Sequence, residues 1–160
     1  EGRKIKLIHI GGASGPCIPE TMLDIPYCYR ALRSEGLALG SGAILVLDDT
    51  NCIIDFLKCV TEFFIDESCG KCVPCRIGNV RLYEILSKFE NGTASEQDIE
   101  NMLVLARVMK SSSFCGLGQS AATALMTCLK YFREEFMEHI EKKCRAGVCS
   151  FSGEEVEAVL

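Results

Sequence analysis

The spacing of hydrophobic residues changes near residue 48 of the chain. Before that point, apolar residues form two short runs, over 5–10 and 43–47, which are separated by turns rich in glycine and proline. Short apolar runs bounded by such turns predict strands. We therefore expect residues 1–48 to form a small unit of strands and turns, with one or two helical turns over 26–34.

Beyond residue 48, apolar residues recur every three or four positions, which is typical of amphipathic helices. This spacing predicts four helices over about 51–66, 76–90, 96–110 and 118–143. The capping-box pattern from Thr93 to Glu96 marks the start of the third helix. Because short loops join the four helices, we expect a four-helix bundle and an α+β fold class.

The composition of the chain argues against two classes of protein, nucleic-acid-binding proteins and membrane-spanning proteins. The net charge is −5 without a basic patch, which argues against nucleic-acid binding, and no apolar run reaches the ~18 residues of a membrane helix. The chain starts without Met or an apolar leader, so we expect a cytoplasmic piece of a longer protein. Its eleven cysteines are then expected to be reduced and, where they cluster, to bind metal.

The main cysteine motif is C-x-x-C-x-x-C, formed by Cys69, Cys72 and Cys75. Three thiolates at this spacing can hold three corners of a [4Fe–4S] cluster. Residue 79, where a bacterial ferredoxin run has its next cysteine, is Asn, so the fourth ligand must be distant. The candidate is Cys115, because antiparallel helices would return its glycine-rich loop to the motif. A zinc site and a thiol-redox sensor acting through Cys69 and Cys72 are the alternatives.

A second group comprises His139, Cys144 and Cys149 near the end of the chain. One more ligand would complete a tetrahedral zinc site. We expect Cys59 to supply it, because its helical spacing from neighbouring phenylalanines places it toward the core. The alternative is a histidine at the core edge with two free thiols. Four further cysteines are expected to act as small buried apolar residues: Cys17, Cys28, Cys52 and Cys128.

The run over 67–76, together with Ser-Phe-Cys-Gly-Leu-Gly-Gln-Ser over 113–120, resembles a known family. It is similar to the flavoprotein subunit of NADH:quinone oxidoreductase and to the beta subunit of NAD(P)-reducing, electron-bifurcating iron-only hydrogenases. The resemblance implies a soluble-ligand-binding (SLBB) β-grasp-like domain over 1–48 and a four-helix iron–sulfur domain over 49–143. It also implies that 144–160 is a tail leading to a ferredoxin-like module.

The resemblance implies that the intact protein passes single electrons from FMN, reduced by NAD(P)H, through a [4Fe–4S] cluster. Four residues would ligate this cluster: Cys69, Cys72, Cys75 and Cys115. The implied partners are a [2Fe–2S] thioredoxin-like subunit and a catalytic hydrogenase or dehydrogenase subunit, without direct membrane insertion. Since the FMN and NAD(P)H domain is missing from this chain, we expect the chain alone to be inactive. The alternative function is a zinc-binding interaction module without electron transfer.

Overall fold

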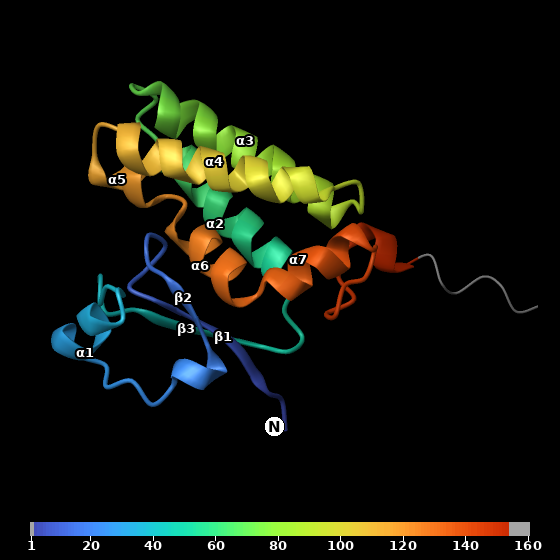
Figure 1. The fold of residues 1–160 in the computed structure, drawn as a ribbon, viewed down its shortest axis with the longest axis horizontal. Helices are drawn as coiled ribbons and strands as arrows, with labels where there is room; N and C mark the ends of the chain where they lie inside the picture. Colours follow the sequence, from blue (N-terminus) through green and yellow to red (C-terminus); the bar gives the residue numbers. More distant parts are fainter. Residues whose placement is uncertain (1, 154–160) are drawn as a thin grey trace, which may run out of the picture.

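A small antiparallel sheet lies against one side of a larger helical body (Figure 1). The structure, a computed structural model, describes residues 2–153, so the last part of the predicted tail, 154–160, lies outside the described residues. Its strands are β1 (Ile5–Ile10), β2 (Cys17–Pro19) and β3 (Ile44–Asp48). Its α-helices are α1 (Tyr29–Ser34), α2 (Ile53–Glu67), α3 (Val73–Glu90), α4 (Glu96–Ser112), α5 (Gly116–Ser120), α6 (Thr123–Tyr131) and α7 (Arg133–Ile140). The described residues also form two short 3-10 helices, η1 (Glu20–Met22) and η2 (Ser150–Gly153).

The central strand of the sheet is β1, which pairs antiparallel with both β2 and β3. Its side chains alternate between two apolar layers, as the pleat of a strand requires. Ile8 and Ile10 pack with Leu32 of α1, whereas Leu7 joins the core of the helical body. The predicted strands and the helical turn near residue 30 are thus present, and β2 adds a third strand.

The long helices α2, α3 and α4 correspond to the first three predicted helices. The prediction of one helix over 118–143 is wrong, because the chain there forms α5, α6 and α7. The backbone leaves helical geometry at Ala122, with φ −93° and ψ 9°, and at Phe132, with φ −130° and ψ 28°. A straight helix over 118–143 would be about 39 Å long, against about 22 Å for α2. The breaks therefore keep α6 and α7 beside the core.

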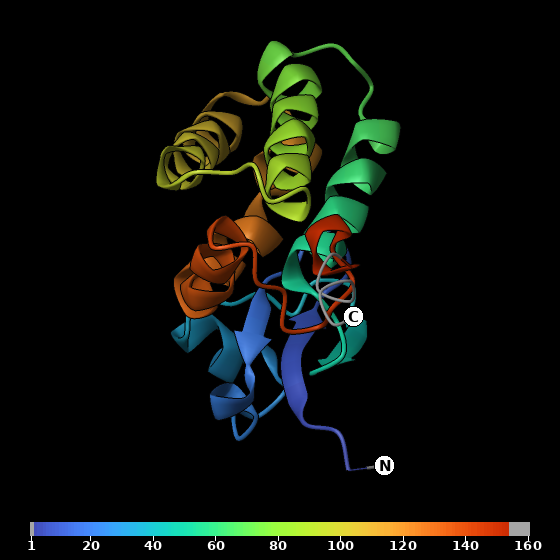
Figure 2. The same ribbon diagram turned by 90° about the vertical axis from the view of Figure 1, so that its right-hand side faces the viewer.

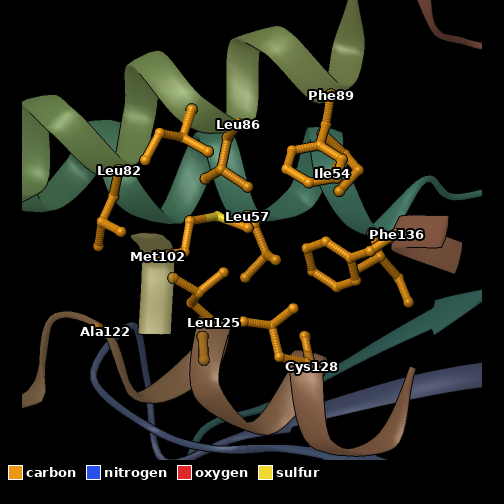
Figure 3. Packing of buried hydrophobic residues seen from close by; sticks show 14 of the residues in the cluster. Ile54, Leu57, Leu82, Leu86, Phe89, Met102, Ala122, Leu125, Cys128 and Phe136 are labelled. Carbon is orange, nitrogen blue, oxygen red and sulfur yellow. The ribbon is translucent and has the colours of Figure 1, made fainter. Parts of the chain in front are cut away.

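The main core lies where α2 and α3 meet α6 and α7 (Figure 3). Phe89 of α3 and Phe136 of α7 meet edge to face, with ring centroids 5.6 Å apart. Figure 2 shows the sheet at one end of the molecule and α3 with α4 at the other, with α6 and α7 between them. Among the helices of residues 2–153, none combines the length and the apolar character that a membrane crossing needs.

Candidate metal centres

The four predicted cluster cysteines lie on two neighbouring loops at one end of the helical body. Cys69 lies in the loop between α2 and α3, Cys72 is the N-cap residue of α3, and Cys75 lies in its first turn. Cys115 is the residue before α5. The unpaired N–H groups and the positive dipole end of the 18-residue α3 favour negative charge, and therefore thiolates, at this end.

The Cys115 loop packs directly on the C-x-x-C-x-x-C segment. A Cβ atom placed on Gly118 of α5 would lie 2.8 Å from the Cβ atom of Cys75 and 2.6 Å from Ser113 Oγ, so a side chain at residue 118 would fill this space. Hydrogen bonds from the backbone at Phe114 and Cys75 lower the pKa of the Cys72 thiol. The structure thus brings the two segments together at a point where one sulfur is stabilised as thiolate.

The sulfur environment differs across the four cysteines. Cys72 and Cys75 are buried, whereas Cys69 and Cys115 are exposed. Ser68 Oγ lies 3.4 Å and Asn79 Nδ2 lies 3.6 Å from Cys75 Sγ. The opposite amide oxygen of Asn79 and the hydroxyl of Ser113 are buried without a hydrogen-bond partner among the described residues. Four thiols, polar donors around them and a gap that only glycine leaves open fit a [4Fe–4S] cluster.

A second group of ligand atoms lies at the other end of α2. It consists of Cys52, His139, Cys144 and Cys149, whose ligand atoms all lie within 4.8 Å of one another. Cys52 Sγ is 3.7 Å from Cys149 Sγ and 3.2 Å from His139 Nε2. Cys149 Sγ is 3.4 Å from the same nitrogen.

These separations are close to the edges of a zinc tetrahedron, with the two sulfur–nitrogen distances somewhat shorter than the ideal edge. Two sulfurs about 2.3 Å from one zinc ion lie about 3.8 Å apart, and a sulfur and an imidazole nitrogen lie about 3.6 Å apart. The 3.7 Å between Cys52 Sγ and Cys149 Sγ is within a tenth of an ångström of the first value. Three thiols and one imidazole are also a donor set that zinc prefers. The residues present therefore fit a tetrahedral zinc ion.

The protein orients His139 for metal binding. Its Nδ1 lies 2.6 Å from the backbone carbonyl of Glu135 and donates to it, so Nε2 is the ring nitrogen that faces the sulfurs. Burial disfavours the imidazolium, but the hydrogen bonds to Cys52 and to the Glu135 carbonyl, together with the negative charge of the nearby thiolates, outweigh burial and raise the pKa of His139 to about 9. The hydrogen bonds with Cys149 and His139 hold the pKa of the Cys52 thiol well below its usual value, against the effect of burial. A divalent cation would replace the protons that these ligands share.

Neighbouring contacts fix the elements that carry this group. Lys6 of β1 donates to the carbonyl of Asn51 and lies 3.1 Å from the Glu135 carboxylate. The two contacts of Lys6 therefore tie the sheet to α7 and to the segment just before α2. Backbone hydrogen bonds from Val148 and Cys149 to Cys144 oppose the effect of burial and lower the pKa of the Cys144 thiol.

The structure corrects the fourth member of the predicted zinc set. Cys59 is exposed, and it lines an open groove with Phe56 and Phe63. Phe63 is itself 46% exposed, so the spacing of Cys59 from Phe63 follows the outer face of α2 and not the core. Cys52 takes the place instead, because it lies at the start of α2 beside the end of α7.

The remaining cysteines divide into two kinds. Cys17 and Cys128 are fully buried, as predicted for small apolar residues. Cys28 is exposed, so the prediction is wrong for this residue. Cys52 is buried as predicted, but its sulfur also lies within the second group of ligand atoms. The signal that could have identified Cys52 is its position at the predicted N-terminus of a helix, where the backbone is still extended and the side chain can turn away from the helix axis.

Comparison with known proteins gives relatives for most of the chain. The NADP-reducing hydrogenase protein HndC of Solidesulfovibrio fructosivorans is 35% identical over 94% of this chain and 31% of its own length. The F 2 subunit of NADH-quinone oxidoreductase of Rhizobium meliloti (strain 1021) is 39% identical over 89% of this chain and 34% of its own. The chain thus spans about a third of the length of the curated relatives it matches.

Solved structures and a family model agree with these relatives. An NAD+-reducing [NiFe]-hydrogenase in its H2-reduced state superposes with a TM-score of 0.77 at 26% identity, over 86% of this chain and 23% of that chain. A model of the NADH-ubiquinone oxidoreductase-F iron-sulfur binding region matches residues 55–139, which include Cys69, Cys72, Cys75 and Cys115. The chain belongs to the family of the NADH-ubiquinone oxidoreductase-F iron-sulfur binding region.

Proposed function

We propose that this chain is the electron-transfer region of an NAD(P)H-dependent flavin and iron–sulfur oxidoreductase subunit. The observation that carries the proposal is the convergence of the Cys115 loop on the C-x-x-C-x-x-C segment at the start of α3. Four thiolates there would hold a [4Fe–4S] cluster: Cys69, Cys72, Cys75 and Cys115. When bound, the cluster supplies one-electron redox chemistry.

The residues around the site hold, orient and partly shield the cluster. Cys72 and Cys75 would anchor its inner side, where N–H and O–H groups reach the sulfurs. Cys69 and Cys115 would ligate its exposed side, which is the side open to electron exchange. Phe114 beside Cys115 is 83% exposed and Val73 beside Cys72 is 59% exposed. Apolar side chains around an exposed edge favour docking of a partner.

The names of the relatives support a role for this chain within a multi-subunit oxidoreductase. The relatives are named as subunits of NADH-quinone oxidoreductase and of an NADP-reducing hydrogenase, and these names support a role within a larger assembly that handles NADH or NADPH. We propose that FMN and NAD(P)H bind outside this chain, and that electrons pass to a [2Fe–2S] thioredoxin-like subunit and a catalytic subunit. The chain alone is then inactive with NAD(P)H. Its cysteine content supports a reducing, cytoplasmic location.

The second group supports a structural zinc ion. Four ligand atoms close to a tetrahedron, from four separate positions in the chain, would join α2, α7 and the loop over 144–149. All four positions of the ion would be filled by protein, as in structural rather than catalytic zinc sites. We propose that this zinc ion holds the carboxyl-terminal segment against the helical body.

A zinc-binding interaction module without electron transfer is the second candidate function. The specific observation that favours it is the complete ligand set around His139. This candidate function gives no role to the four cysteines that meet at the start of α3. The two candidate functions differ in the iron and sulfide content of the same preparation.

The experiment is a metal and acid-labile sulfide analysis of the anaerobically reconstituted chain, with Cys115→Ser beside it. About four irons and four sulfides per chain, with a broad absorption band near 400 nm in a brown protein, are expected. Cys115→Ser should lose or degrade the cluster, and Cys28→Ser, which changes an exposed cysteine elsewhere, should not. Zinc uptake without stable iron uptake would overturn the electron-transfer proposal.

The same analysis counts zinc in a second pair of variants. One zinc per chain is expected in the parent, near zero in Cys52→Ser and one in Cys59→Ser, since the latter side chain lies outside the group. Retention of zinc by Cys52→Ser and its loss from Cys59→Ser would restore the ligand set that the sequence predicts.

A further inference from the structure

We propose that Asn79 and Ser68 are positioning residues that hydrogen-bond to the sulfur of Cys75 and raise the reduction potential of the cluster. The inference rests on the proposed function, because it concerns the cluster that Cys75 would hold. It goes further by naming which side chains set how readily the site accepts an electron.

Asn79 is placed by α3 directly behind the cluster ligand. It follows Cys75 by four residues, so the two side chains lie one above the other on the same helix face. Asn79 is 1% exposed, and its Nδ2 atom lies 3.6 Å from Cys75 Sγ. A buried amide at helical spacing from a thiolate can donate to it without any movement of the backbone.

The orientation of this amide follows from its neighbours. Asn79 Nδ2 also lies 3.5 Å from the backbone carbonyl of Phe64, which can only accept. The carbonyl is available because Ser68, the residue that would donate to it in a continued helix, donates its N–H to Ile65 instead. The two hydrogens of the NH2 group thus have two acceptors, Phe64 O and Cys75 Sγ. If the amide were reversed, its oxygen would face two acceptors, Phe64 O and Cys75 Sγ, and could bond to neither.

Ser68 completes the donor set from the other side. Its Oγ atom accepts a hydrogen bond from the N–H of Gly70 at 3.3 Å and lies 3.4 Å from Cys75 Sγ. Because one lone pair of the oxygen is engaged by Gly70, the hydroxyl hydrogen is free to turn to the sulfur. Cys75 therefore lies between two side-chain donors from two different segments, the end of α2 and the second turn of α3.

The effect on potential follows from charge. Addition of an electron makes the cluster and its thiolates more negative, so a donor to a ligand sulfur stabilises the reduced form more than the oxidised form. Hydrogen bonds to the sulfurs are one of the factors that set cluster potentials. Removal of either donor is expected to shift the midpoint potential to a more negative value, and removal of both to shift it further.

A purely structural role for Asn79 predicts a different result. If the amide served only to satisfy Phe64 O at the end of α2, its loss would change stability and leave the potential of a loaded cluster unchanged. The potential therefore separates a donor to sulfur from a helix cap.

The test is a redox titration of the anaerobically reconstituted full chain, followed by electron paramagnetic resonance of the reduced cluster. The variants are Asn79→Leu, which keeps the branching at Cγ but removes the donor, Ser68→Ala, and the two combined. Asn101→Leu is the matched control, because Asn101 is an exposed amide on α4. Asn79→Ser provides a polar replacement whose shorter side chain withdraws the donor from the sulfur, in case the leucine variant does not fold.

We expect all variants to contain as much iron and sulfide as the parent. The midpoint potential should be more negative in Asn79→Leu or Asn79→Ser and in Ser68→Ala, and most negative in the double variant. Asn101→Leu should match the parent. Unchanged potentials in loaded Asn79 and Ser68 variants would overturn the inference while leaving the proposed function intact. Failure of the parent chain to take up a cluster would instead refute the proposed function.

Discussion

The two cysteine groups lie at opposite ends of α2, separated by the length of that helix, about 22 Å. The first draws three of its four residues from a single loop and helix start, and two of the four are exposed. The second draws its residues from the start of α2, the end of α7 and the loop after it, and three of the four are buried. The same ligand chemistry is therefore built in two different ways.

The difference teaches what each group can do. An electron carrier needs one side open to a partner, which the exposed Cys69 and Cys115 provide. A structural ion needs ligands from segments that would otherwise separate, which Cys52 and Cys149, 97 residues apart, provide. Loss of the first group should therefore remove function and keep the fold, whereas loss of the second should weaken the fold itself.

The largest effect is expected from His139→Ala. The substitution removes one ligand of the proposed zinc ion and leaves three thiols in a largely buried space, so zinc affinity and the folding free energy that depends on it should fall together. We expect the free energy of unfolding to drop by about 4 kcal/mol, measured by urea denaturation of zinc-loaded protein.

The matched control is Cys59→Ala, which removes an exposed thiol from the middle of α2. It should stay within about 0.5 kcal/mol of the parent. Equal stability of His139→Ala and Cys59→Ala would show that the second group holds no structural ion, and the contrast between the two ends of α2 would disappear.

A smaller effect is expected at the first group from Gly118→Ala. The added Cβ would lie 2.6 Å from Ser113 Oγ and 2.8 Å from the Cβ atom of Cys75, so the Cys115 loop must move away from α3. Overpacking of this kind costs about 1–3 kcal/mol. The main observable is a lower iron and sulfide content after reconstitution, with zinc content unchanged.

Gly116→Ala serves as its control, because the same methyl group there meets nothing within 4 Å on the same short helix. It should load iron and sulfide like the parent. If Gly118→Ala loads equally well, the close packing of the Cys115 loop on Cys75 is not needed for the cluster.

The sequence made the first group predictable and left the second incomplete for a physical reason. Cys69, Cys72 and Cys75 are near neighbours in the chain, so their spacing alone implies shared geometry. Cys52 reaches His139 only through the way α2 and α7 pack, which depends on the break at Phe132. The helical spacing of apolar residues continues through Phe132 without a break. The local pattern also does not show that Cys59 lies on the outer face of α2.

The smallest effect is expected from Asp98→Ala, in the first turn of α4. Asp98 accepts from the N–H and the hydroxyl of Ser95 in a capping box, and its carboxylate lies 2.8 Å from Lys88 Nζ. Loss of such a cap costs about 1 kcal/mol. Neither cysteine group is touched, so iron, sulfide and zinc contents should match the parent.

The stability that this cap contributes depends on pH. Burial raises the pKa of Asp98, but the hydrogen bonds from Lys88 and Ser95 outweigh it and hold the pKa below its usual value. The cap therefore stabilises the fold fully above about pH 4, and the contribution is lost as the pH falls through the lowered pKa. Parent and Asp98→Ala should differ in urea denaturation at pH 7 and converge at lower pH. If this variant also lost zinc or iron, reduced stability alone would explain metal loss, and His139→Ala would no longer distinguish the two ends of α2.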